Sequence, residues 1–417
     1  MAADSREKTA PHPRREPRYD GPLTPQRLEE IFQDCVDFTR RPVALEGESA
    51  CTLTLCYLGG MVRMERVSDY VLRPLAQDQG LRQCRTAAEA MKRMESGALY
   101  NLGVARRTQL DRGVFDLVEG WCLLFFPGES EALSFFVGTE EKRSISAPAN
   151  ETVLKGARDS FVESVRTNTS IVRRHLKAPE LRIREERVGR QSATLVDVLY
   201  LEGLTNPQLA EELLEQLRDI DIDGVFATGN IEEYIVPAAR TPFPLVQYTE
   251  RSDRFCAGLT QGRVGLLIDG IPLGYLTPAV LGNFLQTPQD KSSGWLLATT
   301  LTLLRYLCML LTLFLPALYV AMVTFHQEMI PTRLALSIIA AKENVPFRSG
   351  FEVIVLLLAF EILQEAGLRL PQSIGQTVSI IGGLVVGSAA VEAKIVSPAV
   401  LIVVAIAGIA GYTMPSQ

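Results

Sequence analysis

The feature that most constrains this chain is a long stretch without charge in its last third. Tyr306 to Phe325 gives 20 consecutive residues with no Asp, Glu, Lys or Arg. As an α-helix, 20 residues extend about 30 Å, which is the thickness of the hydrocarbon core of a bilayer. We therefore expect a transmembrane helix at this position.

Charge is distributed very unevenly along the 417 residues. Only six of the 42 Lys and Arg residues and six of the 48 Asp and Glu residues lie beyond residue 295. Two more uncharged stretches, 370–391 and 395–417, predict further spans near 373–391 and 396–413. We expect an α-helical polytopic transmembrane domain over 296–417, with about four spans and with either a missing tail or a fragmentary record at its C-terminus.

The remaining span, 349–367, is apolar but contains Glu352, Glu361 and Glu365. At about 100° per residue, Glu361 and Glu365 lie about 40° apart on one face and Glu352 lies on the opposite side. A charge at mid-bilayer costs roughly 2.5–3.5 kcal/mol, so such residues are usually sheltered and functional. We predict that Glu352, Glu361 and Glu365 line or gate a polar path, with Arg369 pairing with Glu365. In a second interpretation, Glu352 and Glu365 sit at the two membrane interfaces and only Glu361 is deep.

Two other segments of this region have different roles. Ser379, Gly383 and Gly387 recur every four residues, and such a stripe indicates close helix packing more often than a pore wall. Residues 326–348 contain Pro331 and Pro346, and the stretch between these prolines is too short to span a bilayer. We expect an interfacial or re-entrant helix there.

The first 295 residues alternate strand-like apolar runs with amphipathic helices, which indicates two small α/β subdomains, 26–150 and 151–295, after a leader over 1–25. Residues 50–57 predict a buried strand, and 121–137 and 263–275 each predict a hairpin. Residues 156–176 predict a helix with its arginines on the polar face, and 206–220 a second helix with an acidic, solvated face. The leader has no apolar segment, so we expect no signal peptide.

Several functional classes are disfavoured. The net charge of −6 without a basic patch argues against nucleic-acid binding. The three histidines (positions 12, 175 and 326) have no partners at metal-ligand spacing, and phosphate-loop, dinucleotide and nucleophile-elbow motifs are absent from the sequence. We therefore expect no metal, no cofactor and no enzymatic activity. Seven scattered cysteines indicate reduced thiols and a cytoplasmic N-terminal region.

The chain resembles the A-subunit family of bacterial spore germinant receptors, of the GerA type. In the membrane part, the resemblance is carried by LPALYVAMVTFHQEMIPT at 315–332, ENVPF at 343–347, FEILQEAGLRLP at 360–371, and IGQTVSIIGGLVVG at 374–387. In the soluble part, it is carried by residues 156–176, 188–190, 252–254 and 262–272. A related sporulation protein of stage V shares the membrane motifs, and the sequence alone does not separate the two.

The resemblance implies a multi-pass protein of the spore inner membrane that works with a transporter-like B subunit and a lipoprotein C subunit. It further implies homo-oligomers that act as a nutrient-gated cation channel and trigger germination. Members of the family usually continue with further hydrophobic segments beyond the point that corresponds to Gln417. The alternative function is a non-conducting scaffold that couples a nutrient-binding partner to another release channel, and a secondary transporter is disfavoured by the small number of expected spans.

Overall fold

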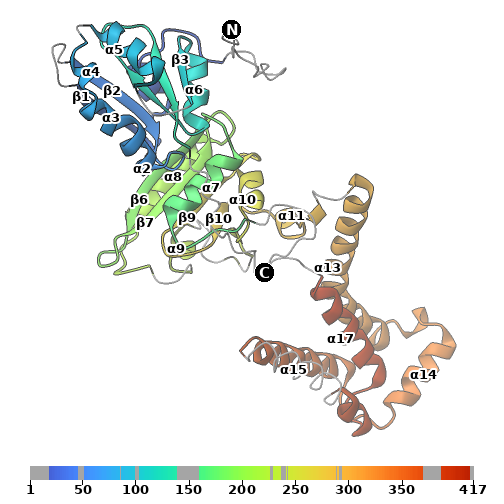
Figure 1. The fold of residues 1–417 in the computed structure, drawn as a ribbon. Helices are drawn as coiled ribbons and strands as arrows, with labels where there is room; N and C mark the ends of the chain where they lie inside the picture. Colours follow the sequence, from blue (N-terminus) through green and yellow to red (C-terminus); the bar gives the residue numbers. More distant parts are fainter. Residues whose placement is uncertain are drawn as a thin grey trace. The chain divides into compact units, whose positions relative to one another are not determined.

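The computed structural model describes residues 18–45, 51–84, 86–98, 103–138, 159–225, 229–235, 241, 243–287, 289–290, 294–369 and 387–413. The chain forms two compact units, Met1–Ala279 and Val280–Gln417. The first unit contains two β-sheets, and the second unit is helical in the residues described (Figure 1).

The first sheet has five antiparallel strands. These are β1 (Phe38–Leu45), β2 (Cys51–Leu58), β3 (Val104–Arg107), β4 (Trp121–Phe125) and β5 (Ala132–Phe136). Their order across the sheet is β1-β2-β4-β5-β3. Strands β2 and β4 are the expected buried strand and the first arm of the expected hairpin, and β4 pairs with β5 as predicted.

Helices cover both faces of this sheet, which explains why its central strands are apolar without alternation. On one face, Leu123 and Phe125 pack with α1 (Pro25–Ile31) and α6 (Leu110–Val118). On the other face, Cys122 and Leu124 pack under a run of short helical segments. This run comprises α2 (Met64–Val67), η1 (Ser68–Leu72), α3 (Arg73–Gln77), α4 (Gln79–Arg82), α5 (Ala87–Arg93) and η2 (Met94–Ala98).

The second sheet repeats the arrangement of the first. Its strands are β6 (Leu181–Val188), β7 (Thr194–Leu201), β8 (Gln247–Thr249), β9 (Val264–Ile268) and β10 (Gly274–Thr277), in the order β6-β7-β9-β10-β8. Helices α7 (Val165–His175) and α10 (Ser252–Leu259) cover one face, and α8 (Pro207–Asp219) and α9 (Gly229–Ile235) cover the other. Strands β9 and β10 form the second expected hairpin, which turns at Gly270 with φ +84°.

The two sheets therefore share one topology, whereas the sequence pattern predicts two α/β subdomains without their strand order. The predicted boundary at residue 150 falls outside the described residues. Among the described side chains, six cysteines are unpaired and five of these are buried, and the side chain of Cys51 is outside the described part. The reduced state stays a prediction.

The two subdomains of the first unit are joined through a fully buried ion pair. Arg173 of α7 donates from Nε to Asp37 Oδ2 at 2.6 Å and from Nη2 to Asp37 Oδ1 at 2.8 Å. Burial by itself would lower the pKa of Arg173, but the opposite charge of Asp37 raises it above its usual value. Beside the pair, the amide of Val36 donates to the carbonyl of Ile183 at 3.0 Å, so the first subdomain also pairs with the edge strand β6.

One expectation for α7 is wrong. The sequence pattern places all its arginines on the polar face, whereas Arg173 is 0% exposed. Because its guanidinium is paired with a carboxylate from another subdomain, burial of the charge is compensated. A helical pattern shows which residues share a face, but it does not show a partner more than a hundred residues away.

The second unit is built from helices. They are α11 (Leu281–Phe284), α13 (Trp295–Thr324), η3 (Gln327–Met329), α14 (Thr332–Lys342), α15 (Ser349–Arg369) and α17 (Pro398–Gly411). Helices α13 and α15 pack against α17 around Val353, Leu356, Val396, Val400 and Val404. Among the described residues, α13 alone is long and apolar enough to cross a membrane.

The four expected spans are thus met in part. Helix α13 contains the first, and its 30 residues begin 11 positions before Tyr306. Helix α15 coincides with the acidic segment expected at 349–367, and α17, with 14 residues, lies within the span expected near 396–413. Most of the span expected near 373–391 lies outside the described residues. Helix α14 matches the short helix expected between Pro331 and Pro346.

The Arg173–Asp37 pair gives a test of how the first unit is held together. In Arg173→Met, Asp37 becomes a buried carboxylate without its partner, so the free energy of unfolding should fall by about 3–5 kcal/mol. The double variant Asp37→Leu, Arg173→Met should recover most of this loss, because neither buried charge remains. Denaturant titration in a Trp295→Phe background, followed by the fluorescence of Trp121, measures both, and the exposed neighbour Arg174→Met is the control. Equal stabilities of the Arg173 and Arg174 variants would contradict the assignment.

Candidate functional site

The acidic helix α15 divides its three glutamates between two faces. Glu352 is 1% exposed, whereas Glu361 and Glu365 are exposed in the isolated chain. This division follows the angles expected for a regular helix, because Glu361 and Glu365 share a face and Glu352 lies opposite. The side chain of Arg369 is outside the described residues, so its pairing with Glu365 stays a prediction.

Glu352 lies where four helical segments meet. Its Oε2 accepts a hydrogen bond of 2.8 Å from the amide of Ser397, the N-cap residue of α17. The negative charge of this carboxylate also interacts favourably with the partial positive charge at the N-terminus of α17. Its Oε1 lies 3.4 Å from Nζ of Lys342, the last residue of α14. Tyr319 of α13 packs against the adjoining apolar cluster, so α13, α14, α15 and α17 converge on this carboxylate.

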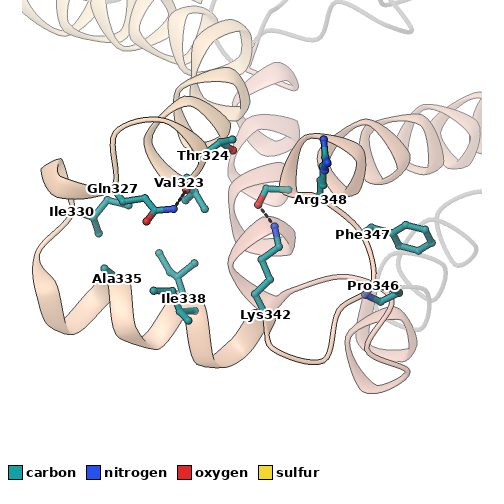
Figure 2. A pocket seen from close by; sticks show the side chains of 12 residues that line it. Val323, Thr324, Gln327, Ile330, Ala335, Ile338, Lys342, Pro346, Phe347 and Arg348 are labelled. Carbon is teal, nitrogen blue, oxygen red and sulfur yellow. Dashed lines mark hydrogen bonds between the residues drawn. The ribbon is translucent and has the colours of Figure 1, made fainter.

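A pocket of about 430 Å³ lies on the α14 side of this junction (Figure 2). It is formed by the end of α13, by η3 and the residue after it, by α14, and by the loop that leads into α15. Lys342 points from α14 towards Ser349, to which its ammonium donates a hydrogen bond, and Arg348 lies beyond it. We call this cavity the α14 pocket.

The N-terminal third of α13 carries a second charge pair. Arg305 donates to both carboxylate oxygens of Asp290, at 2.5 and 3.0 Å, and to the carbonyl of Leu285. Because Arg305 is the last charged residue before Tyr306, the pair marks the start of the 20-residue uncharged stretch within α13. The 20 residues from Tyr306 therefore remain the segment that fits a bilayer.

The stripe of small residues is only partly described. Ser379 and Gly383 lie outside the described residues, and a Cβ at Gly387 would lie 3.3 Å from Cδ1 of Leu401. A second close approach lies at Gly408 of α17, where a Cβ would lie 2.8 Å from the ring of Phe360 of α15. Only glycine permits that close approach. Nothing in the sequence pattern around Gly408 indicates the contact, because Phe360 lies on another helix.

The first unit contains a cluster of Asp159, His175 and Ser252 that sequence spacing did not reveal. Nε2 of His175 is 2.5 Å from Oδ2 of Asp159 and 3.1 Å from Oγ of Ser252. The Ser252 hydroxyl also hydrogen-bonds to Oδ2 of Asp159 at 2.8 Å. In a hydrolase triad, the acid and the serine contact different nitrogens of the histidine. Here both contact the same nitrogen, and Ser252 is fully buried, so the cluster is not arranged for nucleophilic catalysis.

Electrostatics make this cluster an ion pair. The hydrogen bond to Asp159 raises the pKa of His175, against the opposing effect of burial. The same hydrogen bond lowers the pKa of Asp159 to about 2, again against the effect of burial. Within the described part of the chain, no group of three or more His, Cys, Asp or Glu side chains is placed to hold a metal ion.

Comparison with known proteins gives one family. Residues 26–417 match the model of the Bacillus/Clostridium GerA spore germination protein. "Spore germination protein KA" of Bacillus subtilis is 36% identical over 380 residues, which are 91% of this chain and 69% of that protein. "Uncharacterized membrane protein YfkQ" of Bacillus subtilis is 34% identical over 406 residues, which are 96% of this chain and 78% of that protein.

One solved structure is similar as well. It is the N-terminal domain of the A subunit of the Bacillus megaterium spore germinant receptor GerK3, with 26% identity and a TM-score of 0.47. The match covers 61% of this chain and 92% of that structure.

The position of Glu352 predicts that it stabilises the helical unit. Glu352→Gln removes the charge that pairs with Lys342, so we expect a loss of about 1–3 kcal/mol, seen as a lower melting temperature of the full chain in detergent micelles. Glu361→Gln makes the same chemical change at an exposed position of the same helix and should leave the melting temperature nearly unchanged. A similar loss in both variants would contradict the placement of Glu352.

The Asp159–His175 pair predicts a pH dependence of stability. Because the pKa of folded His175 is raised above about 6.5, its contribution is complete below that pH and is lost as pH rises through the raised value. The contribution of Asp159 is complete above about pH 4 and is lost as pH falls towards 2. His175→Gln should flatten the fall in unfolding free energy above about pH 6.5. His326→Gln, in the other unit, is the control, and an unchanged slope in the His175 variant would disprove the ion pair.

Proposed function

The chain belongs to the Bacillus/Clostridium GerA spore germination protein family, the A subunits of spore germinant receptors, and from this premise we propose that it forms a nutrient-gated cation channel. In this proposal, the helical unit crosses the spore inner membrane several times, and the two-sheet unit lies on its cytoplasmic side. The chain acts by opening an ion path and starting germination, and it catalyses no reaction.

The observation that carries the proposal is the exposed acidic face of α15. Glu361 and Glu365 share this face with Ile354 and Leu358, which are 64% and 60% exposed. A carboxylate facing lipid costs roughly 2.5–3.5 kcal/mol near mid-bilayer, so this face needs water or another protein surface beside it. Several copies with their α15 helices around one aqueous path meet this requirement, and rings of carboxylates attract cations.

The same face offers an apolar constriction. An apolar ring can close such a path by dewetting, and the candidates are the leucines at 356, 357 and 358. Leu356 is 7% exposed and packs inside the helical unit, whereas Leu357 and Leu358 are 37% and 60% exposed. Leu358 lies about 20° from Glu365 on the helix and Leu357 about 80° from it, so Leu358 is the best placed of the three. We therefore assign closure of the path to Leu358, one turn from the acidic pair.

Partners follow from the family. We propose assembly with a transporter-like B subunit, which binds the nutrient, and with a lipoprotein C subunit. Helix α13 supports contacts within the membrane, because large apolar side chains such as Leu307, Leu313 and Phe314 are more than half exposed. In a membrane these side chains contact lipid or a neighbouring subunit.

Cation flux tests this function directly. The receptor with all its subunits is reconstituted in liposomes, and K⁺ release is measured after addition of the nutrient. Glu361→Gln should lower the flux by roughly fivefold, which corresponds to about 1 kcal/mol, because each copy loses one charge beside the path. Glu343→Gln removes an exposed carboxylate away from α15 and should leave the flux unchanged.

Two results would contradict parts of the proposal. An unchanged flux in the Glu361 variant would remove Glu361 from the ion path. The absence of nutrient-dependent flux in the complete wild-type receptor would favour the scaffold function, in which the A subunit couples a nutrient-binding partner to another release channel.

A further inference from the structure

We propose that the α14 pocket binds an anionic phospholipid, with the phosphate beside Arg348 and Lys342 and one acyl chain along the apolar wall. The inference concerns a ligand site that the channel function does not require. It rests on the proposed insertion of α13 in the membrane.

The chemistry of the walls selects an amphiphile. Most of the lining is apolar, with Ile330, Ile338 and Ile339 on one side and Phe347 on the other. The two basic side chains lie towards the start of α15, where Lys342 donates a hydrogen bond to Ser349, whereas the polar groups of Thr324 and Gln327 lie on the α13 side (Figure 2). A pocket with apolar walls and a few convergent polar groups is the usual form of a small-molecule site, and 430 Å³ is within the usual size range of about 300–1,000 Å³.

The sign of the charge selects an anion. The lining contains two basic side chains and no acidic one. The charge of Lys342 is partly neutralised by Glu352, which lies 3.4 Å from its ammonium and does not line the pocket. Arg348 is exposed, and no ion pair or side-chain hydrogen bond involves it within the described part of the chain. The guanidinium is therefore available, and its planar group of donors suits a phosphate.

The position along α13 selects a lipid. The uncharged stretch ends at the level of Val323, Thr324 and Gln327, and these three residues line the pocket. With 20 residues of α13 across the hydrocarbon core, this level is that of the lipid headgroups. Basic pockets between membrane helices bind anionic headgroups on the cytoplasmic side of membranes. With the two-sheet unit in the cytoplasm, the α14 pocket faces the headgroups of the opposite leaflet, where the same charge chemistry applies. A phospholipid at this level can place its phosphate beside the basic side chains and one acyl chain along the apolar wall at the same time.

Thermal stability of the full chain in detergent micelles tests the proposal. The probes are short-chain phosphatidylglycerol, short-chain phosphatidylcholine and glycerol phosphate. Phosphatidylglycerol should raise the melting temperature in a saturable manner, and the other two should raise it far less. Arg348→Gln should weaken the apparent affinity for phosphatidylglycerol about fivefold, the factor for one basic group near a membrane surface. Ile338→Trp, which fills the apolar wall, should weaken it as well.

A matched control is available on the same helix. Arg333 of α14 is exposed and does not line the pocket, so Arg333→Gln should leave the affinity unchanged. Equal weakening by the Arg333 and Arg348 variants would show a general charge effect and overturn the site. Equal stabilisation by both lipids would overturn the anion preference, and an equal effect of glycerol phosphate would show a free anion as the ligand.

A melting temperature of the lipid-free chain that rises with protein concentration, and that no longer does so in Ile338→Trp, would show a second copy in the pocket and would overturn the proposal. Membrane insertion is checked separately, by retention of the chain in membranes washed with alkaline carbonate. A chain that is retained but does not respond to phosphatidylglycerol contradicts the lipid site alone. A chain that is released contradicts the proposed function.

Discussion

The helical unit depends on the burial of one carboxylate in an apolar surrounding. Glu352 is held by the amide that begins α17 and by the ammonium that ends α14, so one charge ties together helices that offer each other mainly aliphatic side chains. In such a bundle, lipid competes equally for apolar surfaces, and a compensated charge gives the packing a single register. Because Glu352 fixes which side of α15 faces inwards, it also fixes which side faces outwards.

The outward side carries Glu361 and Glu365, and from this follows the need for an assembly. A single copy in a bilayer would present both carboxylates to acyl chains, whereas a ring of copies encloses them with water. The buried and the exposed glutamates of one helix thus have different roles: Glu352 positions the helix, and Glu361 and Glu365 face the proposed path. The family relationship shows a spore germination protein, and this division of the acidic residues is what supports the proposed channel.

Much of this organisation is predictable from sequence, because it depends on local patterns. Apolar runs with turn residues gave the hairpins β4–β5 and β9–β10, and helical spacing gave α8 and the opposite faces of Glu352 and Glu361. The contacts that local sequence patterns do not predict are those between residues far apart in the chain. Arg173 pairs with Asp37, His175 meets Asp159 and Ser252, and Gly408 admits the ring of Phe360. Each of these contacts depends on how helices and strands pack against one another, and neither hydrophobic periodicity nor composition contains that information.

The central claim is that the acidic face of α15 borders water inside a membrane assembly. Substituted cysteines at positions 361 and 366, in the complete receptor in membranes, test it by their reaction with a charged, water-soluble thiol reagent. The account predicts rapid modification at position 361 once nutrient is added, and slow modification at position 366, which is exposed but lies about 140° around the helix. Protection of position 361 in every nutrient state, with labelling by lipid-soluble reagents only, would contradict it.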